Sequence, residues 1–135
     1  MALKGGCLCG DVRYEIDGKL GDAANCHCSM CRKQSGAAFL PGAGVQTKNF
    51  RWTKGQNLIS RYESSPGGVR MFCQKCGSTL AGGPADPKAE MIWIMLGTLD
   101  DDPGVKPSSH VFVGSKAPWF DITDKLPQHK DEPLA

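Results

Sequence analysis

Seven cysteines in three short motifs are the residues of this chain best suited to chemistry. The motifs are Cys7-Leu8-Cys9, Cys26-His27-Cys28-Ser29-Met30-Cys31 and Cys73-Gln74-Lys75-Cys76. An odd number of cysteines cannot pair off completely, and such close spacing favours metal or redox chemistry over a disulfide framework. A structural zinc site is closed by four protein ligands, whereas a catalytic site usually has three ligands and an open position. The seven thiols therefore predict two zinc sites.

The spacing of the motifs indicates how the thiols divide between the two sites. Closed zinc sites are commonly built from two short thiol groups separated by a long stretch of chain. The structural site is expected to combine the first and third motifs, with the ligands Cys7, Cys9, Cys73 and Cys76. The remaining thiols either hold a second, open zinc site or stay free: Cys26, Cys28 and Cys31. His27 lies between two of these ligands, so we expect its ring not to bind the metal.

Length and composition indicate one ordinary globular domain. The chain has 135 residues, of which 40% are hydrophobic and 22% are charged. The N-terminus has no signal-like apolar stretch, and no window approaches the ~18 apolar residues of a membrane span, which predicts a cytoplasmic protein without membrane contact. The formal charge of +2 becomes −1 once seven thiolates hold two zinc ions. The composition therefore gives no support for a nucleic-acid partner.

The elements that must position the thiols are expected to be mainly strands. Seventeen glycines and nine prolines predict many turns, with short helical turns rather than long helices. We expect one domain over residues 1–127 and a flexible C-terminal tail over 128–135. The run 91–96 is the most apolar and is expected to be the central buried strand. Further strands are predicted at 11–16, 37–45, 50–53, 58–62, 69–72 and 110–113.

Each thiol motif has a distinct local setting. Glycines flank the first motif, which is typical of a tight ligand loop. The central motif leads into residues 29–35, which could form a short helix with Ser29 as N-cap and Gly36 as terminator, or a coil held only by its metal. The third motif follows a predicted strand and resembles a zinc knuckle.

Four segments together resemble the glutathione-dependent formaldehyde-activating enzyme family, which includes centromere protein V. They are residues 5–15, 26–36, 72–78 and 115–119, and the likeness extends over about residues 5–127. The resemblance implies a β-tent fold with two zinc sites. It implies a structural zinc on Cys7, Cys9, Cys73 and Cys76 and a catalytic zinc on Cys26, Cys28 and Cys31. The enzymes after which the family is named are longer than this chain. The resemblance therefore extends to the metal ligands and not to the identity of the substrate.

The function implied by the family is a zinc-dependent carbon–sulfur lyase, similar to S-hydroxymethylglutathione synthase. It would add a small thiol such as glutathione to formaldehyde or a related aldehyde, or catalyse the reverse cleavage. Three thiolates on zinc carry a net charge of −1, which suits a centre that holds an incoming thiol as its nucleophilic thiolate. Cations expected near the carboxylates of a glutathione-like thiol are Arg32, Arg70 and Lys116.

Two other classes of function fit parts of the sequence. A thiol redox enzyme could use Cys28-x-x-Cys31, which has redox spacing, and would work without added metal. A non-catalytic zinc module could instead bind a protein or a nucleic acid. Against a nucleic-acid partner, the chain has no lysine- and arginine-rich stripe interleaved with aromatic residues. Turnover of a small thiol that depends on metal separates the lyase from both alternatives.

Overall fold

The computed structural model describes residues 2–131, which form eleven short strands and one α-helix. The first half contains β1 (Leu3–Gly6), β2 (Arg13–Ile16), β3 (Ala23–Cys26), α1 (Ser29–Ser35), β4 (Leu40–Gln46), β5 (Phe50–Lys54) and β6 (Ile59–Ser65). The second half contains β7 (Gly68–Cys73), β8 (Thr79–Pro84), β9 (Met91–Met95), β10 (Ser109–Val111) and β11 (Gln128–His129). The predicted mainly β, single-domain class with short helical turns is confirmed.

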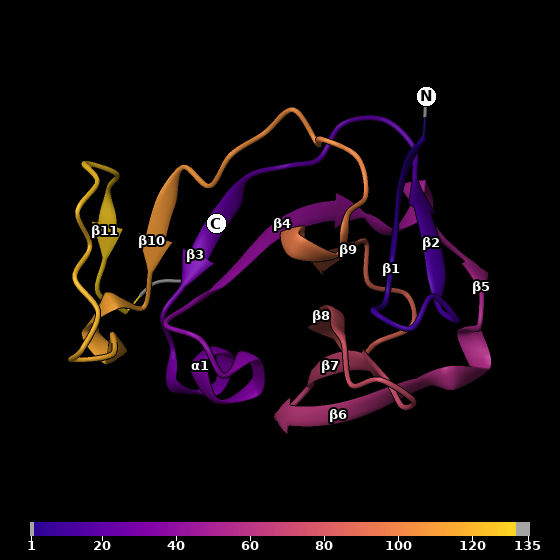
Figure 1. The fold of residues 1–135 in the computed structure, drawn as a ribbon, viewed down its shortest axis with the longest axis horizontal. Coiled ribbons are helices and arrows are strands. Elements are labelled where there is room, and N and C mark those ends of the chain that lie inside the picture. The colour runs from indigo at the N-terminus through magenta and orange to yellow at the C-terminus, as the bar shows by residue number, and fades with distance from the viewer. Residues whose placement is uncertain (1, 132–135) are drawn as a thin grey trace.

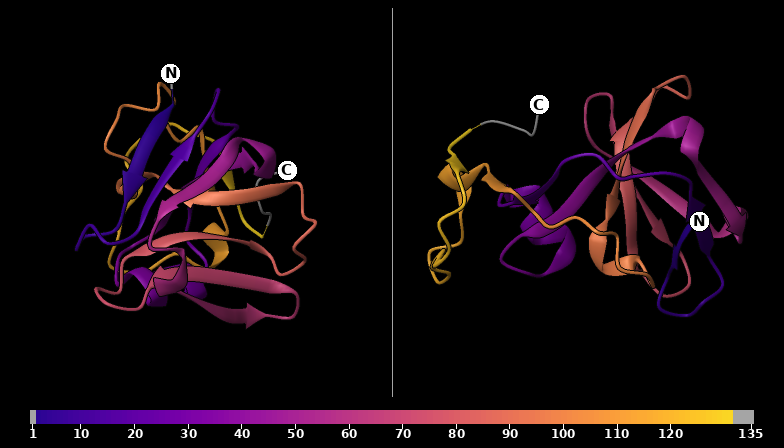
Figure 2. Two further views of the ribbon diagram at one scale, coloured as in Figure 1. Left: turned by 90° about the vertical axis from the view of Figure 1, so that its right-hand side faces the viewer. Right: turned by 90° about the horizontal axis from the view of Figure 1, so that it is seen from above.

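The strands form two sheets (Figure 1). One has three strands in the order β1-β2-β5, and the other has eight in the order β11-β10-β3-β4-β9-β8-β7-β6. All pairings are antiparallel except those of β10, which runs parallel to both β3 and β11. In Figure 1 and in the right-hand view of Figure 2, the segment with β10 and β11 lies at the opposite end of the molecule from the three-stranded sheet.

The main core lies between the two sheets. Tyr14 and Ile16 of β2 are at most 1% exposed, and the Tyr14 ring stacks on Phe50 with a centroid distance of 5.3 Å. Side chains alternate between the two faces of a strand, so β4 and β9 turn Ala43 and Ile94 toward this core. Their alternate residues face away from it, on the side of the sheet where α1 lies.

The prediction for residues 91–96 is only partly right. Met91–Met95 form β9, which lies in the interior of the larger sheet between β4 and β8, and Leu96 begins a short 3-10 helix. Among them, Ile94 is fully buried, whereas Met91 is 42% exposed. The strand is half-buried because the three-stranded sheet covers only one face of the larger sheet at this point.

The C-terminal segment contributes to the larger sheet. Of the tail predicted over 128–135, Gln128–His129 form β11 and pair with β10. These two residues are therefore held in the sheet, while 132–135 lie outside the described residues. In the part of the chain that the structure describes, no helix has the length and apolarity needed to cross a membrane.

Candidate metal centres

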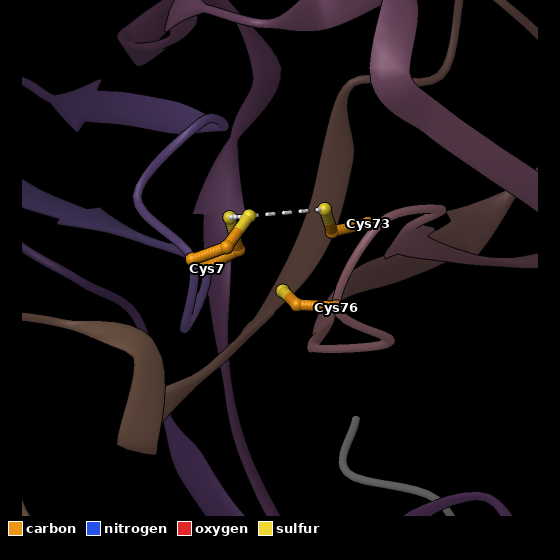
Figure 3. Close-up of side chains that lie close together, drawn as sticks. Cys7, Cys73 and Cys76 are labelled. Carbon is orange, nitrogen blue, oxygen red and sulfur yellow. Dashed lines mark hydrogen bonds between the residues drawn. The ribbon is translucent and has the colours of Figure 1, made fainter.

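The first and third thiol motifs meet in space, as predicted, to form the four-cysteine cluster: Cys7, Cys9, Cys73 and Cys76. Their sulfur atoms all lie within 4.8 Å of one another, and Figure 3 shows three of the side chains converging from two loops. The Sγ–Sγ distances are 3.5 Å from Cys7 to Cys9 and 3.9 Å from Cys9 to Cys73. Tetrahedral zinc with bonds of 2.3 Å needs sulfur atoms about 3.8 Å apart, so this donor set fits zinc.

Backbone hydrogen bonds shape both loops of the four-cysteine cluster. After β1 the chain makes a tight loop in which Cys7 N donates to Val12 O, and Val12 N donates to Cys7 Sγ at 3.2 Å. After β7 it makes the predicted knuckle, in which Gly77 N donates to Cys73 O at 2.8 Å. Gly77 has φ 78, a left-handed conformation that glycine adopts without strain.

Ser78 connects the two loops of this cluster. Leu8 N donates to Ser78 Oγ at 2.8 Å, across 70 positions of sequence. The same hydroxyl lies 3.3 Å from Cys76 Sγ. Hydrogen bonds from the Ser78 side chain and backbone lower the pKa of the Cys76 thiol to about 5, which favours the thiolate that a metal requires. Cys7 and Cys73 are buried, Cys76 is half-buried and Cys9 is exposed, so the cluster extends from the core to the protein surface.

The central motif forms a second group of sulfur atoms, the three-cysteine cluster: Cys26, Cys28 and Cys31. Its Sγ atoms also lie within 4.8 Å of one another. Cys26 ends β3, Cys28 precedes α1, and Cys31 lies in the first turn of that helix. Three soft donors without a fourth cysteine are typical of a metal site with one open position.

The predicted helix is present, so the coil alternative is wrong, but its N-cap is Cys28 rather than Ser29. Cys31 N donates to Cys28 Sγ at 3.3 Å, because the cap position directs the Cys28 side chain toward the unpaired N–H groups of the first turn. Gly36 ends the helix as predicted, in the left-handed conformation with φ 68. Cys28 is therefore both the N-cap of α1 and a member of the three-cysteine cluster.

Arg70 of β7 is the cation placed against the three-cysteine cluster. Both of its terminal nitrogens lie 3.6 Å from Cys31 Sγ, and Nη1 also donates to Gln34 Oε1 at 2.8 Å. Its Nε donates to Ser64 Oγ at 3.0 Å, so the guanidinium is held in place. Hydrogen bonds from the thiols of Cys26 and Cys31, assisted by the Arg70 charge, lower the pKa of Cys28 to about 2.

The other two predicted cations are engaged elsewhere. Arg32 Nε donates to the Ser115 carbonyl at 3.1 Å, and Lys116 Nζ donates to the Ala117 carbonyl at 3.1 Å. These contacts fasten the segment after β10 to itself and to α1. Of the three cations, only Arg70 contacts a cluster sulfur in the described part of the chain.

A buried histidine chain next to this cluster was not predicted from the sequence. His27 Nε2 lies 2.8 Å from His110 Nδ1, and His110 Nε2 lies 3.0 Å from a carboxylate oxygen of Asp124. The Asp124 carboxylate can only accept a hydrogen bond, so His110 Nε2 is the donor to it. His110 Nδ1 then accepts, and His27 Nε2 is the donor to His110 Nδ1. Burial, aided by His110, lowers the pKa of His27 to about 4, so its ring is neutral. The His27 ring does not join the group of sulfur atoms.

The three-cysteine cluster opens onto a cavity of about 410 Å³, here called the inner cavity. Cys26, Cys31 and Arg70 form one side of it. Strands β3, β4, β9, β8 and β7 form its floor, on the face that does not pack against the three-stranded sheet. Figure 1 shows α1 beside the ends of β3 and β4. A metal ion on this cluster would therefore face a cavity of substrate size.

Comparison with known proteins decides the family. The sequence model of the glutathione-dependent formaldehyde-activating enzymes matches residues 2–115. The chain belongs to this family. A Halomonas elongata protein that carries the name of such an enzyme is 28% identical over 136 residues, covering 93% of this chain and 83% of that protein. An uncharacterized lyase of Schizosaccharomyces pombe is 29% identical over 77 residues, covering 57% of this chain and 54% of the lyase.

A solved structure shares the fold. A crystal structure of a Rhodobacter sphaeroides protein superposes with a TM-score of 0.60 at 26% sequence identity. The match covers 77% of this chain and 91% of that protein. The family and the fold agree with the resemblance drawn from the thiol motifs.

Proposed function

We propose that the protein is a zinc-dependent carbon–sulfur lyase that joins a small thiol to an aldehyde, or cleaves the product. The observation that carries the proposal is the opening of the three-cysteine cluster onto the inner cavity. Membership of the family and the lyase name of a relative support the same class of reaction. We place a structural zinc on the four-cysteine cluster and a catalytic zinc on the three-cysteine cluster, in a protein of the cytoplasm, where thiols stay reduced.

The reaction forms one carbon–sulfur bond and consumes no oxidant. The thiol sulfur attacks the carbonyl carbon, and the thiol proton ends on the carbonyl oxygen as a hydroxyl group. With glutathione and formaldehyde, the product would be S-hydroxymethylglutathione. A zinc ion held by three thiolates would supply the positive charge that keeps an incoming thiol in its thiolate form.

Arg70 has two roles in this proposal. Its guanidinium lies 3.6 Å from Cys31 Sγ, so it offsets part of the negative charge that three thiolates bring together. It also lines the inner cavity, where a fixed cation could stabilise the oxygen that becomes negative as the carbon–sulfur bond forms. The hydrogen bonds of Arg70 to Gln34 and Ser64 orient its guanidinium toward the cluster.

The recognition of a glutathione-like thiol remains a prediction. Arg70 is the cation best placed to meet a substrate carboxylate. Arg32 and Lys116 hold backbone carbonyls and do not line the inner cavity.

The experiment is a rate measurement on zinc-loaded protein. Glutathione and formaldehyde combine spontaneously, so exchange between free and bound formaldehyde should be followed by NMR with ¹³C-labelled formaldehyde, with a panel of thiols and aldehydes beside it. We expect exchange to accelerate in proportion to protein concentration, and to return to the spontaneous rate with Cys28→Ser. If metal-free protein instead oxidises or reduces thiols, and alkylation stops it, the redox enzyme is the correct function. If no pair reacts faster, the lyase proposal is wrong.

A further inference from the structure

The inner cavity exists because the strands that form its floor carry small residues. Ala24 of β3, Gly42 of β4 and Met95 of β9 lie opposite one another across three adjacent strands. Gly82 of β8 lies opposite Trp93 in the same way. Alanine and glycine leave space above the sheet, and the larger side chains around them form the walls of the cavity.

Those walls are apolar. Leu40, Trp93 and Met95 face the inner cavity, and each lies on the same face of the sheet as Gly42. Among the described residues that line it, Arg70 is the one with a charged side chain. Arg70 lies against Cys31 at the cluster side and already bonds Gln34 and Ser64. The remainder of the cavity therefore offers no ion pair to a carboxylate or an ammonium group.

The cavity is also too large for the smallest aldehyde. Its volume is about 410 Å³. A water molecule occupies roughly 30 Å³ of liquid, and formaldehyde has only two non-hydrogen atoms. Formaldehyde would leave most of the cavity without contacts, so most of the walls would contribute no dispersion energy to its binding.

We propose that the inner cavity binds an apolar aliphatic or aromatic group of the substrate, attached to the thiol sulfur or to the aldehyde carbon. This inference rests on the proposed function and names the class of substrate that the same site accepts. The reaction balances as before, since one carbon–sulfur bond forms and the thiol proton moves to the carbonyl oxygen. The apolar group takes part only through contacts with the cavity walls.

The first test measures binding to the wild-type, zinc-loaded protein. Straight-chain alkanethiols and straight-chain aldehydes of two to six carbons are titrated separately by calorimetry. Each CH₂ moved from water into an apolar site contributes about 0.8 kcal/mol, which is roughly a fourfold gain in affinity per carbon. We expect that gain in one series until the cavity is full, and the series that shows it identifies the reactant that carries the apolar group. Affinity independent of chain length in both series would overturn the inference.

The second test fills the cavity by Gly42→Val. A Cβ atom at Gly42 would lie 3.8 Å from Met95 Cε and from Trp93 Cε3, which is ordinary contact. The matched control is Gly44→Val on the same strand, where the nearest atom is Met91 Cε at 3.0 Å. Met91 is 42% exposed and can move, and Gly44 does not line the cavity.

Gly42→Val should weaken binding of the six-carbon ligand at least tenfold and change binding of the two-carbon ligand little. Gly44→Val should leave both affinities unchanged. Equal weakening by the two variants, or none by Gly42→Val, would contradict the cavity as the binding site. If Gly42→Val does not fold, Gly42→Ala gives the same comparison with a smaller expected loss of about threefold.

These outcomes separate the inference from the proposed function. Chain-length-dependent binding without turnover of any thiol and aldehyde pair would refute the lyase and keep the apolar site. Full turnover of glutathione with formaldehyde, together with no dependence on chain length, would refute the apolar site and keep the lyase.

Discussion

The two cysteine clusters differ mainly in how the chain assembles them, since each contains both buried and more accessible thiols. The four-cysteine cluster joins two loops more than sixty positions apart and has an exposed member, Cys9. The three-cysteine cluster comes from one hexapeptide, and its thiols are buried or half-buried. A metal in the first would tie distant parts of the chain together and have all four positions filled. A metal in the second would add little to the topology and keep one position free.

We therefore expect sequence separation and ligand number to indicate the role of each cluster better than burial does. Cross-linking distant residues restricts the unfolded chain, whereas ligands within one turn restrict it little. The four-cysteine cluster should therefore matter most for folding. The three-cysteine cluster should matter most for binding and reaction.

Loss of a ligand from the four-cysteine cluster should have the largest effect. A structural zinc contributes on the order of 10 kcal/mol or more to apparent folding free energy. Cys76→Ser replaces a thiolate by a hydroxyl that binds zinc far more weakly, so we expect insoluble protein or loss of cooperative unfolding. Circular dichroism against temperature measures this. A soluble variant with an unchanged melting midpoint would show that this cluster does not hold the fold together.

The same exchange in the three-cysteine cluster should abolish function and spare the fold. Cys28→Ser leaves two thiolates at the cluster, so thiol-dependent turnover should fall by orders of magnitude. It should cost about 0–2 kcal/mol of stability, as modest substitutions do. Turnover and urea unfolding should be measured on one preparation. If Cys28→Ser unfolds as severely as Cys76→Ser, both clusters are structural. If Cys28→Ser keeps full activity, the three-cysteine cluster is not catalytic.

Chelation should distinguish the clusters in the unchanged protein. The free position of the three-cysteine cluster would give a chelator direct access to a metal bound there, whereas a metal on the four-cysteine cluster would have four protein ligands. We expect mild chelation to remove one zinc per chain and leave the circular dichroism spectrum intact. Native mass spectrometry counts the ions before and after. Simultaneous loss of two ions with unfolding would contradict a division into four ligands and three.

The smallest effect on the metal centres is expected from the buried histidine chain. His110→Ala removes the acceptor for His27 Nε2 and leaves a buried donor without a partner, which costs about 1–3 kcal/mol. Because His27 lies between Cys26 and Cys28, zinc should also leave the three-cysteine cluster faster. Urea unfolding and the rate of zinc transfer to a chromogenic chelator measure the two effects. The control is Asp124→Asn, at the half-exposed end of the histidine chain. It should lower stability and speed zinc release less than His110→Ala does.

An unchanged rate of zinc transfer in His110→Ala would show that the histidine chain supports only the fold. A changed rate for the four-cysteine cluster in the same variant would show that the two clusters are coupled. One experiment with the chelator gives the rate of zinc release from each cluster when the two zinc ions are released in separate kinetic phases.

The sequence by itself determined how the thiols group, because residue type and short spacing are properties of the local chain. The grouping of Cys26, Cys28 and Cys31 follows from the turn that begins α1. The division of seven thiols into four and three followed from ligand counting, and the structure brings together the same two groups. Alternation along residues 11–16 likewise predicted a strand with one buried face, and β2 forms over Arg13–Ile16 of this range.

Only the tertiary structure decided what surrounds the clusters. The pairing of β10 with β3 brings His110 beside His27, and no local pattern encodes that contact across 83 positions. The direction of a long side chain depends on its neighbours, so the sequence could not distinguish Arg32 from Arg70. Of these two arginines, Arg70 contacts the cluster. The inner cavity needs the small residues of separate strands to lie in register. Registers between strands are fixed by packing of the whole sheet, because shifting one strand by one residue exchanges its two faces.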